Sequence, residues 1–429
     1  MRALRKSFRE NLKAYLFLLP SFAILGTFVF WPLVFSFVLS FFKWDFAHQK
    51  DPKFIGLKNY MKLFELREPL PYSLLQSLGY TMMYISLCLV IVLFLYTIIK
   101  REKIGSLYFA SVLNFSSLFL SYMFQNSYLL LILWSVNFLA LILVMIKARF
   151  NRYLNQHLLF SIVVFVFLYI FLRKIILPEG NTKDIFNLIA RIKDDSDFIK
   201  SIYNTTYYVL LSTPTTVFLS LGVALLLNRV THFKGFYRTS YFIPFVTSIV
   251  AISLVWQWIF NDEYGLLNYI LSWFNISKIP WLKDEKWTIP TIAIVSIWKN
   301  LGYDAVIFLA GLQSIDKSYY EAAEVDGAKR YQKFFYITWP LLSPTTFFIL
   351  VVSMIGNFKV FTTVYVLYNQ LPGPYNQSGL TVVYYVFRKF YQEQKMGEAC
   401  AIAYMLFLII LILTIVQLRI GKEKVQYEN

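Results

Sequence analysis

Two groups of polar side chains interrupt apolar stretches of the sequence and are well suited to bind a polar solute. The first group is Trp298, Asn300 and Tyr303, and the second is Ser353 and Asn357, which share one helix face because they are four residues apart. Serine and asparagine hydrogen-bond hydroxyl groups, and tryptophan and tyrosine faces stack on sugar rings. Polar groups are costly in hydrocarbon and usually face a cavity. The alternative is that they join membrane helices to one another.

A protein-binding surface is indicated by the polar connection 314–344, which reads SIDKSYYEAAEVDGAKRYQKFFYITWPLLSP. Residues 315–325 contain good helix formers and no breaker, and Gly327 provides a turn after which a second short helix can begin. Ala322 and Ala323 leave one helix face flat enough to sit in a groove of another protein. The acidic residues that can meet basic groups there are Glu321, Glu324 and Asp326.

Residue types that commonly carry catalysis or bind metals form no pattern. The histidines His48, His157 and His232 are far apart, and Cys88 and Cys400 lie inside apolar runs, so neither a metal-ligand spacing nor a disulfide framework is present. A polytopic membrane transferase would need a paired carboxylate or a histidine cluster, and we find neither. No Gly-rich stretch ends in Gly-Lys-Ser/Thr, so the chain cannot hydrolyse ATP itself. We expect no catalytic residue, no metal site and no cofactor in this chain.

Membrane-spanning helices must position these residues. The chain has 429 residues, of which 58% are hydrophobic and 15% charged, and its mean hydropathy is +0.55. Soluble proteins average about 45–50% apolar and about 25% charged residues. The excess falls in runs of about 20 residues, the length that a helix needs to cross the bilayer core. We predict an all-α, polytopic transmembrane bundle with ten spans, beginning near residues 14, 78, 107, 127, 158, 206, 240, 289, 345 and 397.

The net charge of +17 is explained better by membrane topology than by nucleic-acid binding. Basic residues cluster in alternate connections, among them 100–103, 147–152 and 229–238. Lysine and arginine concentrate on the cytoplasmic side of a membrane. We therefore expect a multi-pass protein of the cytoplasmic (inner or plasma) membrane with both termini in the cytoplasm and no nucleic-acid partner.

The connection 314–344 resembles that of the membrane-spanning subunits of ATP-binding-cassette (ABC) importers. Their signature is Glu-Ala-Ala, a Gly six residues after the Glu, an Ile ten residues later and a Pro three beyond. The matching residues are Glu321, Ala322, Ala323, Gly327, Ile337 and Pro340. Such a spaced match is far more specific than a lone motif. Flanking stretches, GLQSIDKSYYEAAEVDGA and FKVFTTVYVLY among them, look like the carbohydrate-importing branch, which includes maltose and glycerol-phosphate permeases.

The resemblance implies a type I importer permease with a coupling helix at 315–326. The residues expected to couple to an ATPase are Glu321, Ala322, Ala323, Asp326, Gly327, Ile337 and Pro340, with Glu321 contacting a basic ATPase residue. The implied partners are a second homologous permease subunit, two cytoplasmic ATPase subunits that bind ATP and Mg²⁺, an extracellular sugar-binding protein, the sugar and membrane lipid.

The resemblance also bears on the solute. Ser353 and Asn357 fall where the maltose permease has sugar-contacting polar residues, and an ungapped match carries over Trp298 and Tyr303. We expect import of a sugar or oligosaccharide of the maltose or maltodextrin type. The alternative solutes are a glycerol phosphodiester or another polar molecule, and a receptor-like scaffold is a further alternative that leaves the Glu-Ala-Ala loop unexplained.

Further polar residues inside the predicted spans have less specific roles. Asn300 and Gly302 are expected to loosen their helix locally. Lys299 and Lys359 are expected to face the cavity or to pair with the second permease subunit.

Three segments are expected along the chain. Residues 1–65 hold an N-terminal cytoplasmic segment, the first span and an outer loop. Residues 196–429 hold the permease core with the coupling loop 314–344. Residues 66–195, with about four spans, separate stretches that family members hold close together, and we expect them to form a peripheral helical bundle beside the first span.

Overall fold

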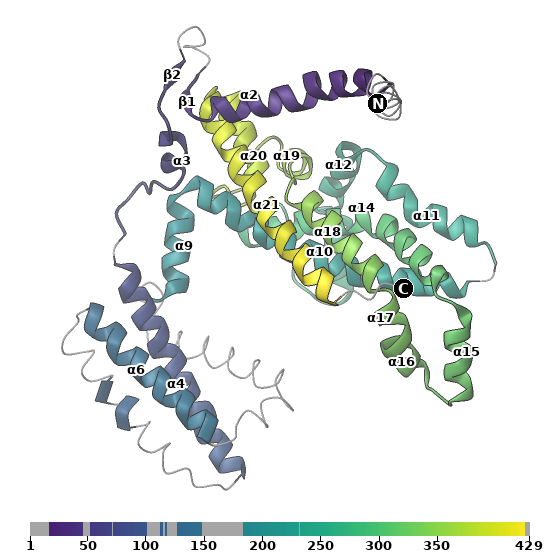
Figure 1. Ribbon diagram of the computed structural model, residues 1–429, viewed down its shortest axis with the longest axis horizontal. Helices are drawn as coiled ribbons and strands as arrows, with labels where there is room; N and C mark the ends of the chain where they lie inside the picture. The colour runs from purple at the N-terminus through teal and green to yellow at the C-terminus, as the bar shows by residue number, and fades with distance from the viewer. Residues whose placement is uncertain are drawn as a thin grey trace, which may run out of the picture. The chain divides into compact units, whose positions relative to one another are not determined.

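The computed structural model describes residues 17–45, 52–70, 72–100, 112–114, 116–117, 127–147, 183–230 and 232–424 (Figure 1). These residues are mainly helical and contain almost no strand, so the predicted all-α class is confirmed. The exception is an antiparallel pair of short strands, β1 (Phe42–Lys43) and β2 (Lys53–Phe54). The chain divides into two compact units, residues 66–195 and residues 1–65 with 196–429.

Several of the predicted spans are present as long apolar helices. Among the described residues, those long and apolar enough to cross a membrane are Phe17–Leu39, Leu74–Ile91, Asp197–Arg229, Glu285–Ser314 and Met396–Gly421. Two helix pairs qualify only together, Gly235–Val246 with Ile249–Ile259, bent by 95°, and Arg330–Leu341 with Ser343–Asn357, bent by 60°. The apolar helix Tyr128–Leu143 is shorter. The predicted spans near residues 107 and 158 lie outside the described residues, so the number of ten spans stays a prediction.

The unit of residues 66–195 is built on two long helices, α4 (Leu74–Lys100) and α6 (Ser127–Lys147), which pack against each other. Tyr84 and Trp134 are fully buried in their contact. α9 (Ile185–Asp195) packs on α4, and the backbone N–H of Ile185 donates to Thr81 Oγ1 at 2.9 Å. The peripheral position expected for this unit stays a prediction.

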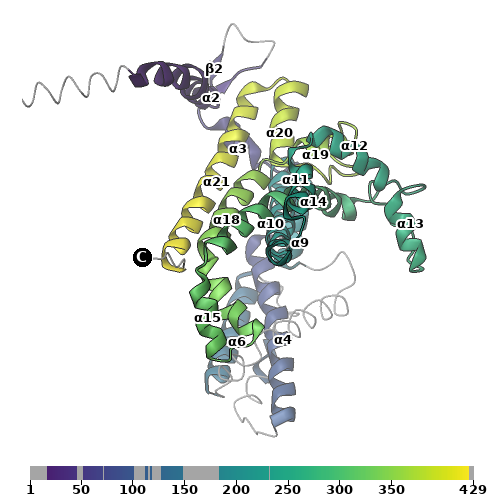
Figure 2. The same cartoon turned by 90° about the vertical axis from the view of Figure 1, so that its right-hand side faces the viewer.

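The unit of residues 1–65 and 196–429 contains the predicted permease core. Before residue 66 its helices are η1 (Gly26–Phe30), α2 (Trp31–Leu39) and α3 (Lys58–Leu63). After residue 196 they are α10 (Asp197–Arg229), α11 (Lys234–Val246), α12 (Ile249–Ile259), α13 (Leu266–Trp273), α14 (Glu285–Ser314), α15 (Lys317–Val325), α16 (Arg330–Lys333), η3 (Phe334–Thr338), α17 (Trp339–Leu341), α18 (Ser343–Asn357), α19 (Thr362–Leu367), α20 (Val382–Phe387), η4 (Arg388–Gln392) and α21 (Met396–Lys424). α10 and α14 form the central pair, α18 packs on both, and α21 packs on α18 and α20 (Figure 2).

The buried face of α10 is lined by small hydroxyl residues. Thr205, Ser212 and Thr216 each donate to the backbone carbonyl four residues earlier, at 2.7–2.8 Å. Their hydroxyl protons are therefore used within α10 itself, and Thr205 Oγ1 also accepts the N–H of Val382 at 3.0 Å. Small residues also let membrane helices approach closely, which explains the extensive contact between α10 and α14.

α14 is a continuous helix, so the expectation that Asn300 and Gly302 loosen it is wrong. Gly302 lies where α11 crosses α14, and a Cβ added there would lie 1.7 Å from the carbonyl oxygen of Tyr241. The glycine therefore serves a close contact between two helices rather than local flexibility.

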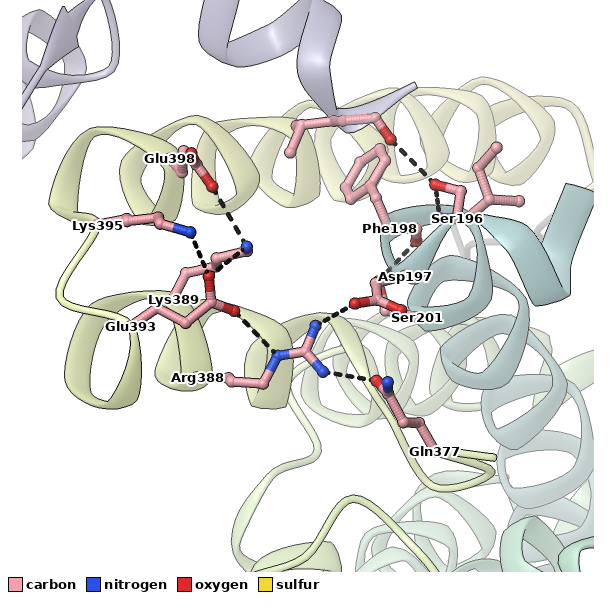
Figure 3. A network of polar contacts seen from close by, with 12 residues as sticks. Ser196, Asp197, Phe198, Ser201, Gln377, Arg388, Lys389, Glu393, Lys395 and Glu398 are labelled. Atoms are coloured by element: carbon pink, nitrogen blue, oxygen red, sulfur yellow. Dashed lines mark hydrogen bonds and ion pairs between the residues drawn. The ribbon is translucent and has the colours of Figure 1, made fainter. Parts of the chain in front are cut away.

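A network of charged side chains ties the beginning of α10 to the segment that joins α20 and α21 (Figure 3). Arg388 donates to Asp197 Oδ2 at 2.6 Å and forms a longer ion pair, of 3.6 Å, with Glu393. Lys389 pairs with Glu393 at 2.7 Å and with Glu398 at 3.3 Å. Burial opposes ionisation of Glu393, but the lysine hydrogen bonds outweigh it and lower the pKa of that carboxyl. Because these groups are partly buried, they hold the two segments more firmly than exposed ion pairs would.

The chain leaves this unit after α3 and returns to it at α10, and the residues at these two positions contact each other. Ser196 Oγ donates to the carbonyl oxygen of Leu63 at 3.1 Å. The rings of Phe64 and Phe198 meet edge to face, with centroids 5.5 Å apart. Ser196 also caps α10 by accepting the N–H of Ile199 at 3.5 Å. The two ends of the intervening segment are thus fixed within the core itself.

Replacing Gly302 by alanine is expected to destabilise the protein, because the added methyl group overlaps a backbone carbonyl and only a shift of α11 can clear it. Overpacking of this kind costs about 1–3 kcal/mol. Thermal unfolding in detergent, followed as loss of the monodisperse species, should show a lower midpoint than for the wild-type protein.

Gly222→Ala in α10 is the matched control, because no atom lies within 4 Å of the added Cβ. Alanine is favoured over glycine inside a helix by about 1 kcal/mol, so this variant should be at least as stable as the wild type. Equal midpoints for the two variants would contradict the close contact.

Candidate functional site

A pocket of about 400 Å³ lies between α10, α14, α18 and the beginning of α19. Four of the five residues selected from the sequence as solute ligands line it: Asn300, Tyr303, Ser353 and Asn357. The further polar lining residues are Tyr208, Thr216, Ser296, Lys299, Asp304, Lys359, Thr362 and Thr363. Trp298 is not in the lining, because its ring is 44% exposed on another face of α14 and meets Trp256 edge to face. The structure thus brings together polar residues from four helices and leaves out one of the two predicted aromatic rings.

Asn357 both lines the pocket and joins helices. Its Nδ2 donates to Thr213 Oγ1 of α10 at 2.8 Å. The hydroxyl of Tyr208 lies 2.7 Å from Ser296 Oγ and 3.4 Å from Asn357 Oδ1, and it has one proton to share between them. The result is a polar contact that links α10, α14 and α18. Sequence reasoning missed Tyr208, although a tyrosine hydroxyl inside an apolar run is the signal that could have found it.

Ser353 lies one helical turn from Asn357 and faces a buried acid. Its Oγ donates to Asp304 Oδ2 at 3.4 Å, and Asp304 is only 3% exposed. A carboxyl group at this depth in a membrane helix is costly and usually faces a cavity or a polar partner. Asp304 has both a cavity and a polar partner, because it lines the pocket and accepts the hydrogen bond from Ser353.

Lys299 occupies the break between α11 and α12. The backbone leaves the helical conformation at Thr247 and Ser248, where ψ is 145° and 127°. Lys299 Nζ donates to the carbonyl oxygens of Pro244, Phe245 and Thr247, at 3.4, 2.6 and 3.2 Å. Carbonyls in the last turn of a helix have no partner within the helix, and a cation also suits the negative end of the helix dipole. Lys299 therefore faces the pocket, as expected, while its ammonium group is used to cap α11.

Aromatic stacking limits how Tyr303 can meet a solute. Its ring stacks on Phe245 with centroids 4.3 Å apart and planes inclined by 15°. One face is therefore covered by protein, and the edge and the hydroxyl group remain for the pocket. Among the described residues, no three His, Cys, Asp or Glu side chains are grouped so that they could hold a metal ion.

The Glu-Ala-Ala signature lies on α15, a short helix without a buried residue. Asp316 begins the helix by accepting the N–H of Ser318 at 2.8 Å, and this backbone hydrogen bond lowers the pKa of its carboxyl. Glu321 and Ala322 are exposed and Ala323 is half-buried. α15 is thus a helix with most of its surface available to another protein.

Gly327 ends α15 in a left-handed conformation, with φ of 71°. Its N–H donates to the Glu324 carbonyl at 3.0 Å, and the N–H of Ala328 donates to the Ala323 carbonyl at 2.9 Å. These two bonds are the Schellman arrangement, which needs a left-handed residue after the helix. The family glycine is therefore required by backbone conformation, since open space surrounds it. The exposed Asp326 directly precedes it.

The rest of the loop folds back toward the bundle. Lys333 pairs with Glu324 at 2.6 Å, and its hydrogen bond lowers the pKa of that carboxyl. The hydroxyl groups of Tyr320 and Thr338 lie 2.9 Å apart. The last two signature residues, Ile337 in η3 and Pro340 in α17, are half-buried. α15 is therefore fastened to the segment that leads into α18.

Comparison with known proteins matches a family of membrane transport proteins to the part of the chain that holds the pocket and the loop. A family model described as "binding-protein-dependent transport system inner membrane component" matches residues 195–422. The arabinooligosaccharides transport system permease protein AraP of Halalkalibacterium halodurans is 34% identical over 223 residues, which cover 52% of this chain and 70% of the relative. The sn-glycerol-3-phosphate permease UgpA of Agrobacterium fabrum is 34% identical over 58% of this chain and 84% of its own, and the lactose permease LacF of Rhizobium radiobacter is 30% identical over 55% and 80%.

A solved structure shares the fold. The bacterial alginate ABC transporter, crystallised with an alginate pentasaccharide-bound periplasmic protein, has a chain that aligns with a TM-score of 0.50 and 24% identity over 66% of this chain and 99% of its own. The chain described here therefore belongs to the family of binding-protein-dependent transport system inner membrane components, as a multi-pass permease subunit of an ABC importer and not an enzyme.

Proposed function

We propose that this subunit imports a sugar or oligosaccharide through the pocket between α10, α14, α18 and α19. Its partners in this proposal are a second homologous permease subunit, two cytoplasmic ATPase subunits that bind Mg²⁺ and ATP, and an external sugar-binding protein. In this proposal both termini lie in the cytoplasm. The names of two of the three relatives, which refer to arabinooligosaccharides and lactose, support a saccharide as the solute.

One observation carries the proposal. The helices that supply most of the polar lining of the pocket, α14 and α18, are the two helices that the coupling loop joins. α14 ends at Ser314, where the loop 314–344 begins, and α18 begins at Ser343, at the end of the loop. A displacement of α15 by an ATPase would act on both walls of the pocket at once. Rigid-body movement of this kind is an established way of switching between two states.

The exposed part of α15 suits the ATPase contact. Glu324 is engaged by Lys333, whereas Glu321 makes no ion pair within the described part of the chain. An exposed carboxylate on a helix with small neighbouring residues can form a charge-assisted hydrogen bond with a basic residue of the partner. Glu321, Ala322, Ala323 and Asp326 form the docking face in this proposal, and Gly327, Ile337 and Pro340 shape the loop.

The pocket suits a polyhydroxylated solute. Its lining includes the amide of Asn300 and the hydroxyls of Ser353 and Tyr303. It also includes the amide of Asn357, whose oxygen shares the hydroxyl proton of Tyr208 with Ser296. The exposed Lys359 also lines it and would tolerate an acidic substituent on the solute. A glycerol phosphodiester is the second candidate, and the name of the UgpA relative keeps sn-glycerol 3-phosphate among the solutes to be tested.

Charge reversal by Glu321→Lys is expected to abolish coupling, because a lysine would repel the basic groups that the proposal places opposite Glu321. The assembled transporter should remain inserted in the membrane, but sugar uptake and sugar-stimulated ATP hydrolysis in proteoliposomes should fall by at least about tenfold, equivalent to roughly 1.4 kcal/mol.

Glu65→Lys is the matched control, since Glu65 is an exposed carboxylate outside the loop. It should retain uptake and ATPase stimulation. Normal transport by Glu321→Lys, with an unchanged ATPase response, would remove the basis for the docking assignment.

Asn357→Ala tests the pocket against a purely structural role. If Asn357 binds solute, the variant should lose most of its uptake while assembly and basal ATPase activity stay unchanged. Hydrogen bonds between membrane helices contribute only about 0.6 kcal/mol on average, so the helix contact alone should be dispensable.

Thr213→Ala removes the same helix-to-helix hydrogen bond, but Thr213 is not part of the pocket lining. It should transport normally. Equal loss of assembly or uptake in both variants would show that Asn357 acts as a helix contact. Uptake assays with maltose, lactose, arabinobiose and sn-glycerol 3-phosphate identify the solute class.

A further inference from the structure

A second pocket, of about 420 Å³, lies at the far ends of α12 and α19 from the first. Its lining includes Gln257, Trp258, Asn261, Tyr264, Tyr368 and Asn369. The family signature and the sequence analysis assign nothing to these residues. On the predicted topology, the connection after α12 lies on the outer side of the membrane.

Two of the three aromatic rings that line this pocket are exposed. Trp258 is 68% exposed and Tyr264 is 72% exposed, whereas Tyr368 is buried and forms part of the floor. Large exposed aromatic rings in a concave, otherwise polar site indicate a binding surface, because their faces are not used by the fold. Ring faces of this kind bind the C–H faces of sugars.

Amide side chains also line this pocket, and Gln257 and Asn261 each use part of their hydrogen-bonding capacity within the protein. Gln257 Nε2 donates to the Leu367 carbonyl at 3.3 Å and to Asn369 Oδ1 at 3.0 Å. Asn261 Oδ1 accepts the N–H groups of Glu263 and Tyr264, at 2.9 and 3.1 Å. The carbonyl of Gln257 and the amino group of Asn261 remain for a ligand, and both side chains are held in place by the bonds already made.

The two pockets are connected by one pair of helices. α12 and α19 pack side by side, as Figures 1 and 2 both show. Ile249 and Thr362, near the beginnings of these helices, line the first pocket, and Trp258 and Leu367, near their ends, line the second. From Ile249 to Trp258 the helix rises by about 13 Å, at 1.5 Å per residue. An oligosaccharide longer than a disaccharide is long enough to span this distance.

We propose that the second pocket is an outer subsite for an oligosaccharide, in which Trp258 and Tyr264 hold sugar rings that trail the ring bound in the first pocket. This inference rests on the proposed sugar transport and names its substrate as a chain longer than a disaccharide. The external protein is the other conceivable occupant, and the experiment distinguishes it.

The test uses the assembled transporter in proteoliposomes with its binding protein. Uptake is measured against the concentration of sugar-loaded binding protein, with maltose and maltotetraose as one pair of probes and arabinobiose and arabinotetraose as another. In Trp258→Ala/Tyr264→Ala the apparent KM for the tetrasaccharide should rise about tenfold, from the loss of two ring contacts, with little change for the disaccharide.

Tyr269→Ala/Trp273→Ala is the matched control, because these rings are also exposed, contact each other on neighbouring α13 and lie outside the pocket lining. It should transport both lengths normally. Tyr264→Ala alone, in a loop position that packing does not fix, provides an independent variant should the double variant assemble poorly, and it should show the same dependence on length.

Unchanged tetrasaccharide uptake in the variants would overturn the subsite. Equal losses for both lengths would also overturn it, and would assign the pocket to the binding protein instead. A wild-type complex that takes up disaccharides only would overturn the subsite but leave the proposed function intact. A wild-type complex that takes up none of the four sugars would refute both.

Discussion

The break between α11 and α12 is the constraint on which the core of this permease depends. A helix that ends inside a membrane leaves carbonyl groups without partners, which hydrocarbon does not tolerate. Lys299 supplies three hydrogen bonds to those carbonyls from the neighbouring α14. The chain can then turn by 95° and send α12 alongside α19. Residues of α12 and α19 line both pockets, so the bend that Lys299 stabilises contributes to the shape of each.

The helix contacts around the first pocket differ in whether their hydrogen bonds lie within one helix or between two. The hydroxyl groups of Thr205, Ser212 and Thr216 donate to carbonyls of their own helix, so they need no acceptor on α14. At the pocket the pattern changes, because Tyr208, Asn357 and Ser353 bond between helices rather than within one. Polar groups that bridge helices can exchange their partners for a solute when the helices move. The pocket is therefore a place in the bundle where polar contacts depend on how the helices are arranged.

The fold class and part of the pocket lining could be predicted from the sequence. Asn300, Tyr303, Ser353 and Asn357 are recognisable because polar residues stand out within apolar runs, and the spacing of four residues places Ser353 and Asn357 on one face. Trp298 could not be separated from Tyr303 in this way, since which side of α14 meets α18 depends on tertiary packing. Gly302 was interpreted as a flexible point because sequence does not show the backbone of α11 that passes beside it. The network around Arg388 joins residues 191 positions apart and had no local pattern.

The contact between Leu63 and Ser196 has a consequence for how this protein acquired its length. The chain leaves the core at Leu63 and re-enters it at Ser196, and a hydrogen bond joins these two residues. The core itself therefore holds the two ends of the intervening segment together, whatever that segment contains. The entropy of closing a loop grows only slowly with its length, so a long excursion costs the core little more than a short one. With the start of α10 secured by Arg388, this junction is a site where evolution can add or exchange an entire module without redesigning the transport machinery.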